Sequence, residues 1–255
     1  MSWSSRRQFG ILSALSLIVI VPVVAVATYL LWERPSCDDG LQNGGERGVD
    51  CGGNCALVCT REVNPPVLSW VRAFPVSKGR YNVVALVENS NSAARADGVR
   101  YRVRVYDQDD VTVAEREGVA DLDPQSVLPI VELGLDTGER TAYRAGFEWL
   151  SDPVWVEAEP EARPVAVVDE RIEVQGQEPR VRASIQNLGA LPINRVAVVA
   201  LVYDIDRNAI AASRTWVDRL GAGASQDVAF TWPAPWTAVA TSLEVVPIYD
   251  APRVR

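Results

Sequence analysis

The residues of this chain whose types and spacing could do chemistry lie in one short segment. Its cysteines are Cys37, Cys51, Cys55 and Cys59, and the sequence has no others. An even number of cysteines in a small, glycine-rich segment predicts two disulfides formed in an oxidising compartment, with three pairings open. Zinc held by all the thiolates is the alternative, but the spacings differ from the paired Cys-x2-Cys of zinc ribbons. We therefore expect a loop stapled by disulfides.

Acidic and amide side chains between these cysteines offer hard oxygen ligands. They are Asp38, Asp39, Asn43, Glu46 and Asp50. Calcium is the cation that such oxygen donors suit. The regular Asp-x-Asp-x-Asp-Gly spacing of a calcium loop is missing, which favours a polar loop rich in turns. We expect no cofactor, with calcium at these side chains as the alternative.

The rest of the composition excludes much catalytic chemistry. The 255 residues include no histidine, which removes the commonest general base and the imidazole ligands of most catalytic metal sites. Neither of the common phosphate-binding glycine motifs is present. The formal net charge of −8 argues against a nucleic-acid partner. Acid pairs such as Asp109 and Asp110 fall in turn-like contexts, so we expect that the protein is not an enzyme.

An uncharged, apolar run precedes the cysteines. Residues 9–32 contain no charged side chain. At about 1.5 Å per residue, a helix of this length crosses a hydrocarbon core of about 30 Å. Arg6 and Arg7 before the run predict a cytoplasmic N-terminus and an extracytoplasmic C-terminal bulk, as in a single-pass protein of the cell membrane. A signal peptide cleaved after the small-x-small residues 25–27 is the alternative, and it exports the remainder equally.

The remainder of the chain repeats itself in short β-rich runs. Residues 83–89 align with 181–187, and 103–107 align with 200–204, at a period of about 98 residues. Apolar alternation broken by Gly, Pro, Asn and Asp predicts strands and turns. A repeat of this length is the size of one sandwich domain. We therefore expect an all-β protein with two tandem immunoglobulin-like β-sandwiches, preceded by one transmembrane α-helix and a small disulfide-rich loop.

Changes of composition set the expected boundaries. The parts are a short cytoplasmic N-terminus (1–8), a transmembrane helix (9–32), a cysteine-rich disulfide motif (33–62), a first sandwich (63–160) and a second sandwich (161–255). The two sandwiches are called copy one and copy two below. This order places both copies on the same side of the membrane as the cysteines.

One strand of copy one has a stripe of arginines. Strict alternation over residues 100–106 directs Arg100, Arg102 and Arg104 away from the core. The expected role of the stripe is cross-strand pairing with acidic side chains, which are abundant in this chain. Binding of anionic lipid headgroups or cell-wall polymers is the alternative.

Other outward positions are apolar and need a cover. Copy two has Val199 and Leu201 where copy one has its arginines, and copy one has Val84 and Leu86 on the outer face of another strand. A strand that is apolar on both faces is normally covered on both, by the neighbouring copy, a second chain or a partner. Shielding by the copy's own loops is the alternative. Trp236 joins these residues as a candidate contact, because exposed indoles stack on sugar rings or anchor protein interfaces.

Two parts of the chain resemble known bacterial modules. Residues 37–55 resemble a small cysteine-rich motif of surface and secreted proteins. The Tyr-Asp strand ends at 106–107 and 203–204 resemble immunoglobulin-like modules named for a Phe-x-Leu-Tyr-Asp signature. Val103 and Val105 stand where that signature has Phe and Leu in copy one, and Ala and Val stand there in copy two. The motif is thus only partly kept.

The order of anchor, four-cysteine motif and two such modules resembles a family of bacterial single-pass membrane proteins without an assigned activity. The resemblance implies a location in the cell envelope. We therefore expect a membrane-anchored, extracytoplasmic binding or structural protein that uses its tandem modules for protein–protein interaction, adhesion or surface-complex assembly, with an envelope protein or surface polymer as partner. A ligand-binding or calcium-dependent accessory or sensor ectodomain of a membrane complex is the alternative.

Overall fold

The structure is a computed structural model that describes residues 15–27, 29, 35–159, 164–174 and 176–249. The chain forms two compact units, Met1–Cys55 and Ala56–Arg255. The first contains a helix and most of the cysteine segment, and the second contains the strands.

The described part of the N-terminal run is helical over residues 15–27. Within the described residues, no helix has both the length and the apolar character that a bilayer crossing needs. Residues 9–14, 28 and 30–32 of the predicted span lie outside the described residues.

The cysteine segment is closed by disulfides, as predicted. Cys37 is bonded to Cys55, 18 residues away. Cys51 and Cys59 are disulfide-bonded as well, and no free cysteine occurs in the part of the chain that the structure describes. The loop turns on glycine: Gly53 has a φ of +65°, and a Cβ there would lie 2.0 Å from the carbonyl oxygen of Gly45. Only glycine fits that approach.

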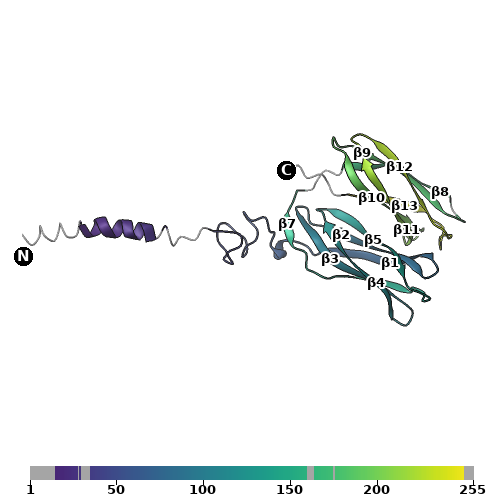
Figure 1. The fold of residues 1–255 in the computed structure, drawn as a ribbon, viewed down its shortest axis with the longest axis horizontal. Helices are drawn as coiled ribbons and strands as arrows, with labels where there is room; N and C mark the ends of the chain where they lie inside the picture. The colour runs from purple at the N-terminus through teal and green to yellow at the C-terminus, as the bar shows by residue number, and fades with distance from the viewer. Residues whose placement is uncertain (1–14, 28, 30–34, 160–163, 175, 250–255) are drawn as a thin grey trace, which may run out of the picture. The chain divides into compact units, whose positions relative to one another are not determined.

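Copy one begins after a short 3-10 turn, Thr60–Glu62, and is built from antiparallel strands (Figure 1). They are β1 (Val67–Ser77), β2 (Arg80–Asn89), β3 (Ala94–Tyr106), β4 (Thr112–Leu122), β5 (Ser126–Asp136), β6 (Arg144–Trp149) and β7 (Trp155–Glu157). One sheet has the order β1-β2-β5, and the other has the order β4-β3-β6 with β7 paired to the start of β3.

The core of copy one lies between these two sheets. Alternation on β3 buries Tyr101, Val103 and Val105, as the sequence predicts. The inward face of β2 supplies Val83 and Ala85 to the same cluster. The sandwich-like arrangement therefore follows directly from the period-2 pattern.

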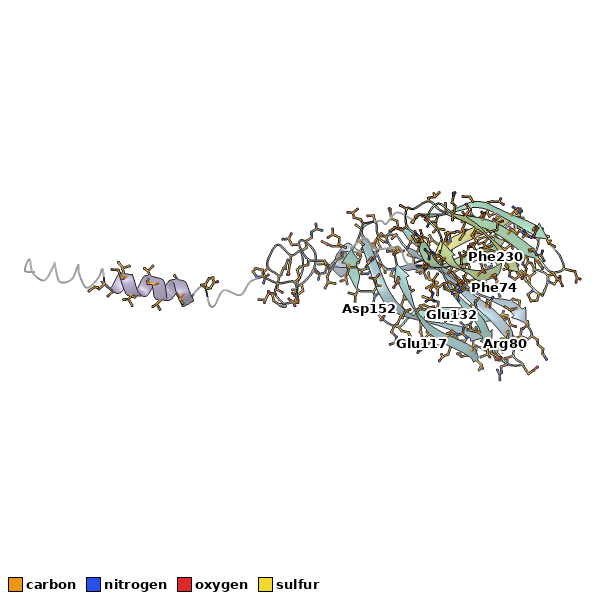
Figure 2. The ribbon with its side chains drawn as sticks, turned by 45° about the horizontal axis from the view of Figure 1, so that its top comes forward. Phe74, Arg80, Glu117, Glu132, Asp152 and Phe230 are labelled. Atoms are coloured by element: carbon orange, nitrogen blue, oxygen red, sulfur yellow. A yellow bond between two sulfur atoms is a disulfide. The ribbon has the colours of Figure 1, made fainter. Side chains whose placement is uncertain are left out.

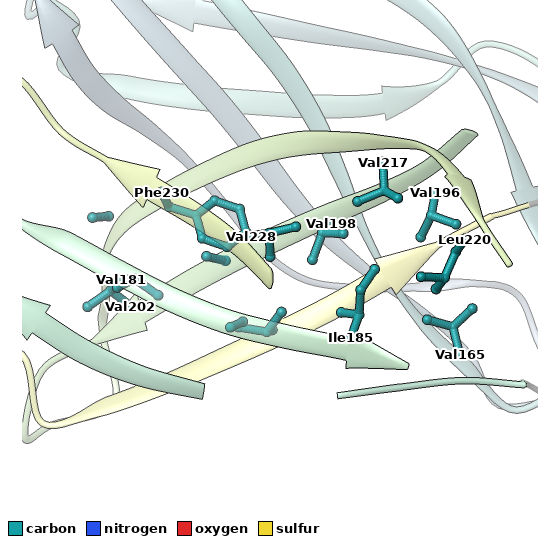
Figure 3. Packing of buried hydrophobic residues seen from close by; sticks show 14 of the residues in the cluster. Val165, Val181, Ile185, Val196, Val198, Val202, Val217, Leu220, Val228 and Phe230 are labelled. Atoms are coloured by element: carbon teal, nitrogen blue, oxygen red, sulfur yellow. The ribbon is translucent and has the colours of Figure 1, made fainter. Parts of the chain in front are cut away.

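Copy two repeats the arrangement with fewer strands. They are β8 (Val165–Val174), β9 (Arg180–Asn187), β10 (Ile193–Tyr203), β11 (Ala209–Leu220), β12 (Ser225–Thr231) and β13 (Ser242–Ile248). The sheets have the orders β12-β9-β8 and β11-β10-β13. Figure 3 shows their shared core, in which the ring of Phe230 packs among branched aliphatic side chains such as Val181, Val198 and Ile185.

A third apolar cluster joins the copies. It contains Phe74 from β1, which is labelled in Figure 2, and Val131 from β5, together with Ala209 and Ala212 from β11. Consequently the sheets β1-β2-β5 and β11-β10-β13 each have an apolar cluster on both faces. A strand in a sheet that is covered on both faces has a nearly continuous run of apolar residues, and β10 has this pattern.

Candidate functional site

The outward apolar residues of both copies meet in that third cluster. Val84, Val199 and Leu201 are fully buried in it, and Leu86 packs against it at partial exposure. The sequence left open whether the neighbouring copy, a second chain or a partner covers these residues. In the structure the neighbouring copy covers them. These four side chains are therefore covered within the molecule, and any surface left for a partner lies elsewhere.

Hydrogen bonds border the cluster. Arg72 on β1 donates from Nη1 to the carbonyl oxygen of Ala209 at 2.9 Å and from Nη2 to Oδ1 of Asn208 at 2.9 Å. Arg214 on β11 donates from Nη1 to the carbonyl oxygen of Val131 at 2.9 Å. These charge-assisted bonds fix the register of two otherwise non-directional apolar faces.

The arginine stripe of β3 is paired with acidic side chains on both neighbouring strands. Arg102 lies opposite Glu117 on β4 and Glu148 on β6, and it forms ion pairs with both. Arg104 pairs with Glu148 at 3.0 Å and with Glu115 at 3.3 Å. The stripe is thus the middle row of a ladder of alternating charge.

The outermost arginine completes this ladder. Arg100 Nη2 lies 3.0 Å from Oε2 of Glu117, the residue labelled in Figure 2, so Glu117 accepts from both Arg100 and Arg102. The hydrogen bond from Arg102 holds the pKa of Glu117 below its usual value, with burial acting in the opposite direction. With its charges compensated, the stripe has little net attraction for an anionic polymer.

Trp236 packs inside copy two. Its ring meets that of Trp232 edge to face at a centroid distance of 5.3 Å, and it lies against the core at partial exposure. The Nε1 atoms of both indoles are buried and lack a hydrogen-bond partner among the described residues. The candidate contact at Trp236 is therefore mainly a core contact.

The acidic residues of the cysteine loop bind its own backbone. Asp39 accepts from the amides of Leu41 at 2.9 Å and Ser36 at 3.3 Å, and from Nδ2 of Asn43 at 2.9 Å. The bond from Asn43 is the main cause of a lowered pKa of Asp39. Asp38 lies at the exposed start of the loop, where it accepts from the hydroxyl of Ser36.

The remaining acids of the loop have the same role. Asp50 accepts from the amide of Gly40 at 3.0 Å, and Glu46 accepts from the amide of Asp50 at 3.1 Å. Glu46 also lies near the sulfurs of Cys37 and Cys55, with the three ligand-type atoms within 4.8 Å of one another. Those sulfurs form a disulfide, so they offer no thiolate to a metal. Turn stabilisation accounts for the geometry of these carboxylates.

The structure contains a cleft that the sequence does not reveal. Its volume is about 760 Å³, and strands from both copies line it. Its lining includes Tyr101, Val119, Glu132, Arg195, Arg214 and Trp216.

The wall of the cleft in copy one is a fixed polar network. Tyr101 donates from its hydroxyl to Oε1 of Glu132 at 2.8 Å. Arg116 forms an ion pair with the other oxygen of Glu132 at 3.4 Å. Burial and the bond to Glu132 raise the pKa of Tyr101, so the phenol stays protonated at neutral pH. The side chain of Glu132, labelled in Figure 2, thus lies between a phenol and a guanidinium group.

The wall in copy two presents an indole between two guanidinium groups. Trp216 is 49% exposed. The guanidinium carbons of Arg195 and Arg214 lie 5.8 and 5.4 Å from its ring centre. The Nε of Arg214 is buried and has no hydrogen-bond partner among the described residues. This wall combines an accessible aromatic surface with positive charge.

Sequence reasoning missed this cleft for a physical reason. Alternation on β11 indicates that Arg214 and Trp216 share a face, but Tyr101 and Glu132 lie in another copy, far away in the sequence. Only the docking of the copies brings these residues to one cleft. One sequence signal for the cleft was available. Trp216 is a large aromatic residue at an outward position of β11, on the same face as the buried Ala212.

Comparisons with known proteins give no family. No family model and no curated protein matches this chain. A red sea bream transglutaminase of known structure is 12% identical, with 74% of this chain and 29% of that chain covered and a TM-score of 0.27. A β-glucuronidase from glycoside hydrolase family 2 is 10% identical, with 86% and 29% covered and a TM-score of 0.24. This chain spans under a third of the length of both, and similarities this distant carry no functional argument.

Proposed function

We propose that this chain is a membrane-anchored, extracytoplasmic binding or structural protein of the bacterial cell envelope. In this proposal two immunoglobulin-like modules, locked together by their shared apolar cluster, serve protein–protein interaction, adhesion or surface-complex assembly. The protein works by binding rather than by catalysis.

The exposed apolar surface of the N-terminal helix is the observation that carries the proposal. The large apolar side chains from Leu15 to Val26 are between 54% and 68% exposed. A helix that is apolar on all sides is stable when it is buried in a protein core or in lipid. Within the described residues of this unit no protein core covers it, so lipid is the cover we propose.

The disulfides support the extracytoplasmic location in this proposal, and the sheets support the binding or structural role. Disulfides persist in oxidising compartments, which supports display outside the cytoplasm. Stacked antiparallel sheets are the architecture of many cell-surface domains, which supports a binding or structural role. The sequence offers no histidine for acid–base chemistry.

Membrane fractionation tests the location. The full chain with a C-terminal epitope tag is expressed in a bacterial host, and membranes are extracted with alkaline carbonate. We expect the wild type to stay in the pellet and its tag to be digested when protease is added to intact spheroplasts. The matched variant is Ile20→Lys with Val23→Lys, since each central lysine costs about 2.5–3.5 kcal/mol of insertion. The variant is expected in the soluble fraction, whereas a soluble, protease-protected wild type would contradict the proposal.

Crosslinking in the same cells tests the binding role. A photoreactive residue at the exposed Leu188 or at Trp216 is expected to form a discrete adduct with another envelope component. A chain that forms no adduct at either position, while still exported, would argue for a passive structural role.

The alternative proposal is an accessory ligand-binding ectodomain, and the cleft is the observation that favours it. Its calcium-dependent form is tested by titration of the full chain with calcium after chelation. Because backbone amides already occupy the loop carboxylates, we expect no spectral change up to millimolar calcium. A saturable change would support the calcium form.

A further inference from the structure

We propose that the cleft between the copies binds a carboxylate-bearing saccharide, such as a segment of a uronic-acid polymer, with Trp216 and Arg195 as central contacts. The inference rests on the binding role proposed above, and it specifies the ligand class. It does not depend on the membrane anchor, because the residues that line the cleft all belong to Ala56–Arg255.

The size and lining of the cleft suit a polar ligand of a few rings. Its volume of about 760 Å³ lies within the usual range for ligand sites, about 300–1,000 Å³. Charged and polar side chains from both copies line it. A ligand rich in hydroxyl groups matches this lining better than an apolar molecule does.

The charges of the cleft are separated, and the copy-two wall, whose charged lining residues are Arg195 and Arg214, is the part that favours an anionic group. The acids of the cleft all belong to copy one: Glu132 is paired with Arg116 and accepts from Tyr101, Asp121 accepts from the amide of Gly98 at 2.6 Å, and Asp123 lines the same wall. Asp97 is paired with Arg95 at 2.9 Å.

The arginines of the copy-two wall, Arg195 and Arg214, have no acidic partner among the described residues. No carboxylate among the described residues lies within ion-pair distance of Arg195 or Arg214, although the chain as a whole is acidic. Arg214 donates one N–H to the carbonyl oxygen of Val131. Because a guanidinium group has five N–H donors, others remain for a ligand. Guanidinium groups left without an acid are the usual partners of ligand carboxylates.

The aromatic surface selects a saccharide among anions. Trp216 is half-exposed beside both arginines, and Val119 opposite is exposed as well. A sugar ring has an apolar C–H face that packs on an indole and a rim of hydroxyls that hydrogen-bond to charged side chains. A free phosphate would leave Trp216 unused, and a neutral sugar would leave the arginines uncompensated. A uronic acid uses both features.

Calorimetric titration of the full chain in detergent tests the inference. The probes are trigalacturonic acid, its neutral counterpart galactotriose, and triglutamate as an acidic peptide. We expect binding of trigalacturonic acid that weakens as salt is raised, and at least tenfold weaker binding of the other two. The variants Trp216→Ala and Arg195→Gln are each expected to weaken trigalacturonic acid binding at least tenfold.

A matched control separates the cleft from general charge. Arg207→Gln removes the same charge from an exposed arginine in the turn between β10 and β11, which like Arg195 has a positive φ. We expect it to bind as the wild type does, and thermal unfolding checks that every variant is folded. Equal affinity for galactotriose or triglutamate, unchanged binding by folded Trp216→Ala and Arg195→Gln, or no binding of trigalacturonic acid would each overturn the inference. These outcomes leave the fractionation result untouched, so the two proposals fail separately.

Discussion

The side-chain amide of Asn187 connects three backbone segments of copy two. The residue is fully buried at the end of β9, and its Nδ2 donates to the carbonyl oxygens of Leu191 at 2.8 Å and Leu220 at 3.1 Å. Its Oδ1 accepts from the amide of Gly189 at 2.9 Å. Asn89 ends β2 in copy one with the same kind of contacts, so this amide is a shared device of the repeat. Buried polar groups persist when all their partners are satisfied.

Replacement of this amide predicts a large loss of stability. Asn187→Asp places a carboxylate oxygen against two carbonyl oxygens in a buried site. We expect the free energy of unfolding in urea to fall by about 3 kcal/mol or more. Asn194→Asp, at an exposed position on β10, is the control and is expected to change it by less than about 0.5 kcal/mol. Similar losses in both variants would contradict the role assigned to Asn187.

Glu117 predicts a pH dependence with a defined sign. Its pKa in the folded state is lowered, first by the hydrogen bond from Arg102. A lowered pKa stabilises the fold above the ordinary carboxyl value of 4.5, and this stabilisation is lost as the pH falls through the folded value. We therefore expect Glu117→Gln to be less stable than the wild type at pH 7 and equally stable at strongly acidic pH. Urea unfolding across pH checks this, and a difference that grows toward acid would contradict it.

At the scale of elements, β2 and β10 have apolar residues on both faces. The sequence indicates this pattern through Val84, Leu86, Val199 and Leu201, and it indicates that each face needs a cover. It cannot identify the cover, because the neighbouring copy, a second chain and a partner present the same chemistry to an isolated strand. Only the three-dimensional structure shows that the two faces bury each other.

A charge in this buried face is predicted to separate or unfold the copies. Leu201→Asp puts a carboxylate at a position with no exposed surface, opposite Ala212 on β11 and Glu244 on β13. We expect unfolding in urea to require at least about 3 kcal/mol less free energy than in the wild type. Ile205→Asp, at a position that is 78% exposed, is expected to be nearly neutral. A wild-type unfolding curve for Leu201→Asp would show that the interface contributes little.

The features that could be predicted from the sequence are those that depend on residues close together in the chain. The strands, the inward alternation on β3 and the formation of disulfides were predictable, because they depend on local period and on cysteine count. The charge ladder was predictable in kind, while its partners Glu117 and Glu148 required the register. The cleft was not predictable, because Trp216 and Glu132 meet only after the copies dock.

At the scale of the whole molecule, the cysteine loop and the sandwich unit depend on different forces. The disulfide of Cys37 and Cys55 closes a loop that has few apolar contacts. The apolar clusters of the sandwiches contain neither of these cysteines. The two units are therefore expected to lose structure independently.

Removal of this disulfide tests that independence. In Cys37→Ser with Cys55→Ser, the loop loses a constraint of about 3 kcal/mol for a loop of this length. We expect rapid proteolysis within residues 36–55 and a melting temperature of the strands that changes by less than about 2 °C. A large drop in that melting temperature would show that the loop supports the sandwiches.

The shared apolar cluster also has a consequence for how the chain is made. Copy one leaves the ribosome first, so the outer face of β2, with Val84 and Leu86, stays uncovered until β10 and β11 have been synthesised. In that interval the late half of a neighbouring nascent chain offers the same complementary surface as the chain's own late half. The surface that joins the two copies within one chain therefore also allows domain swapping, in which copy one of one chain packs on copy two of another.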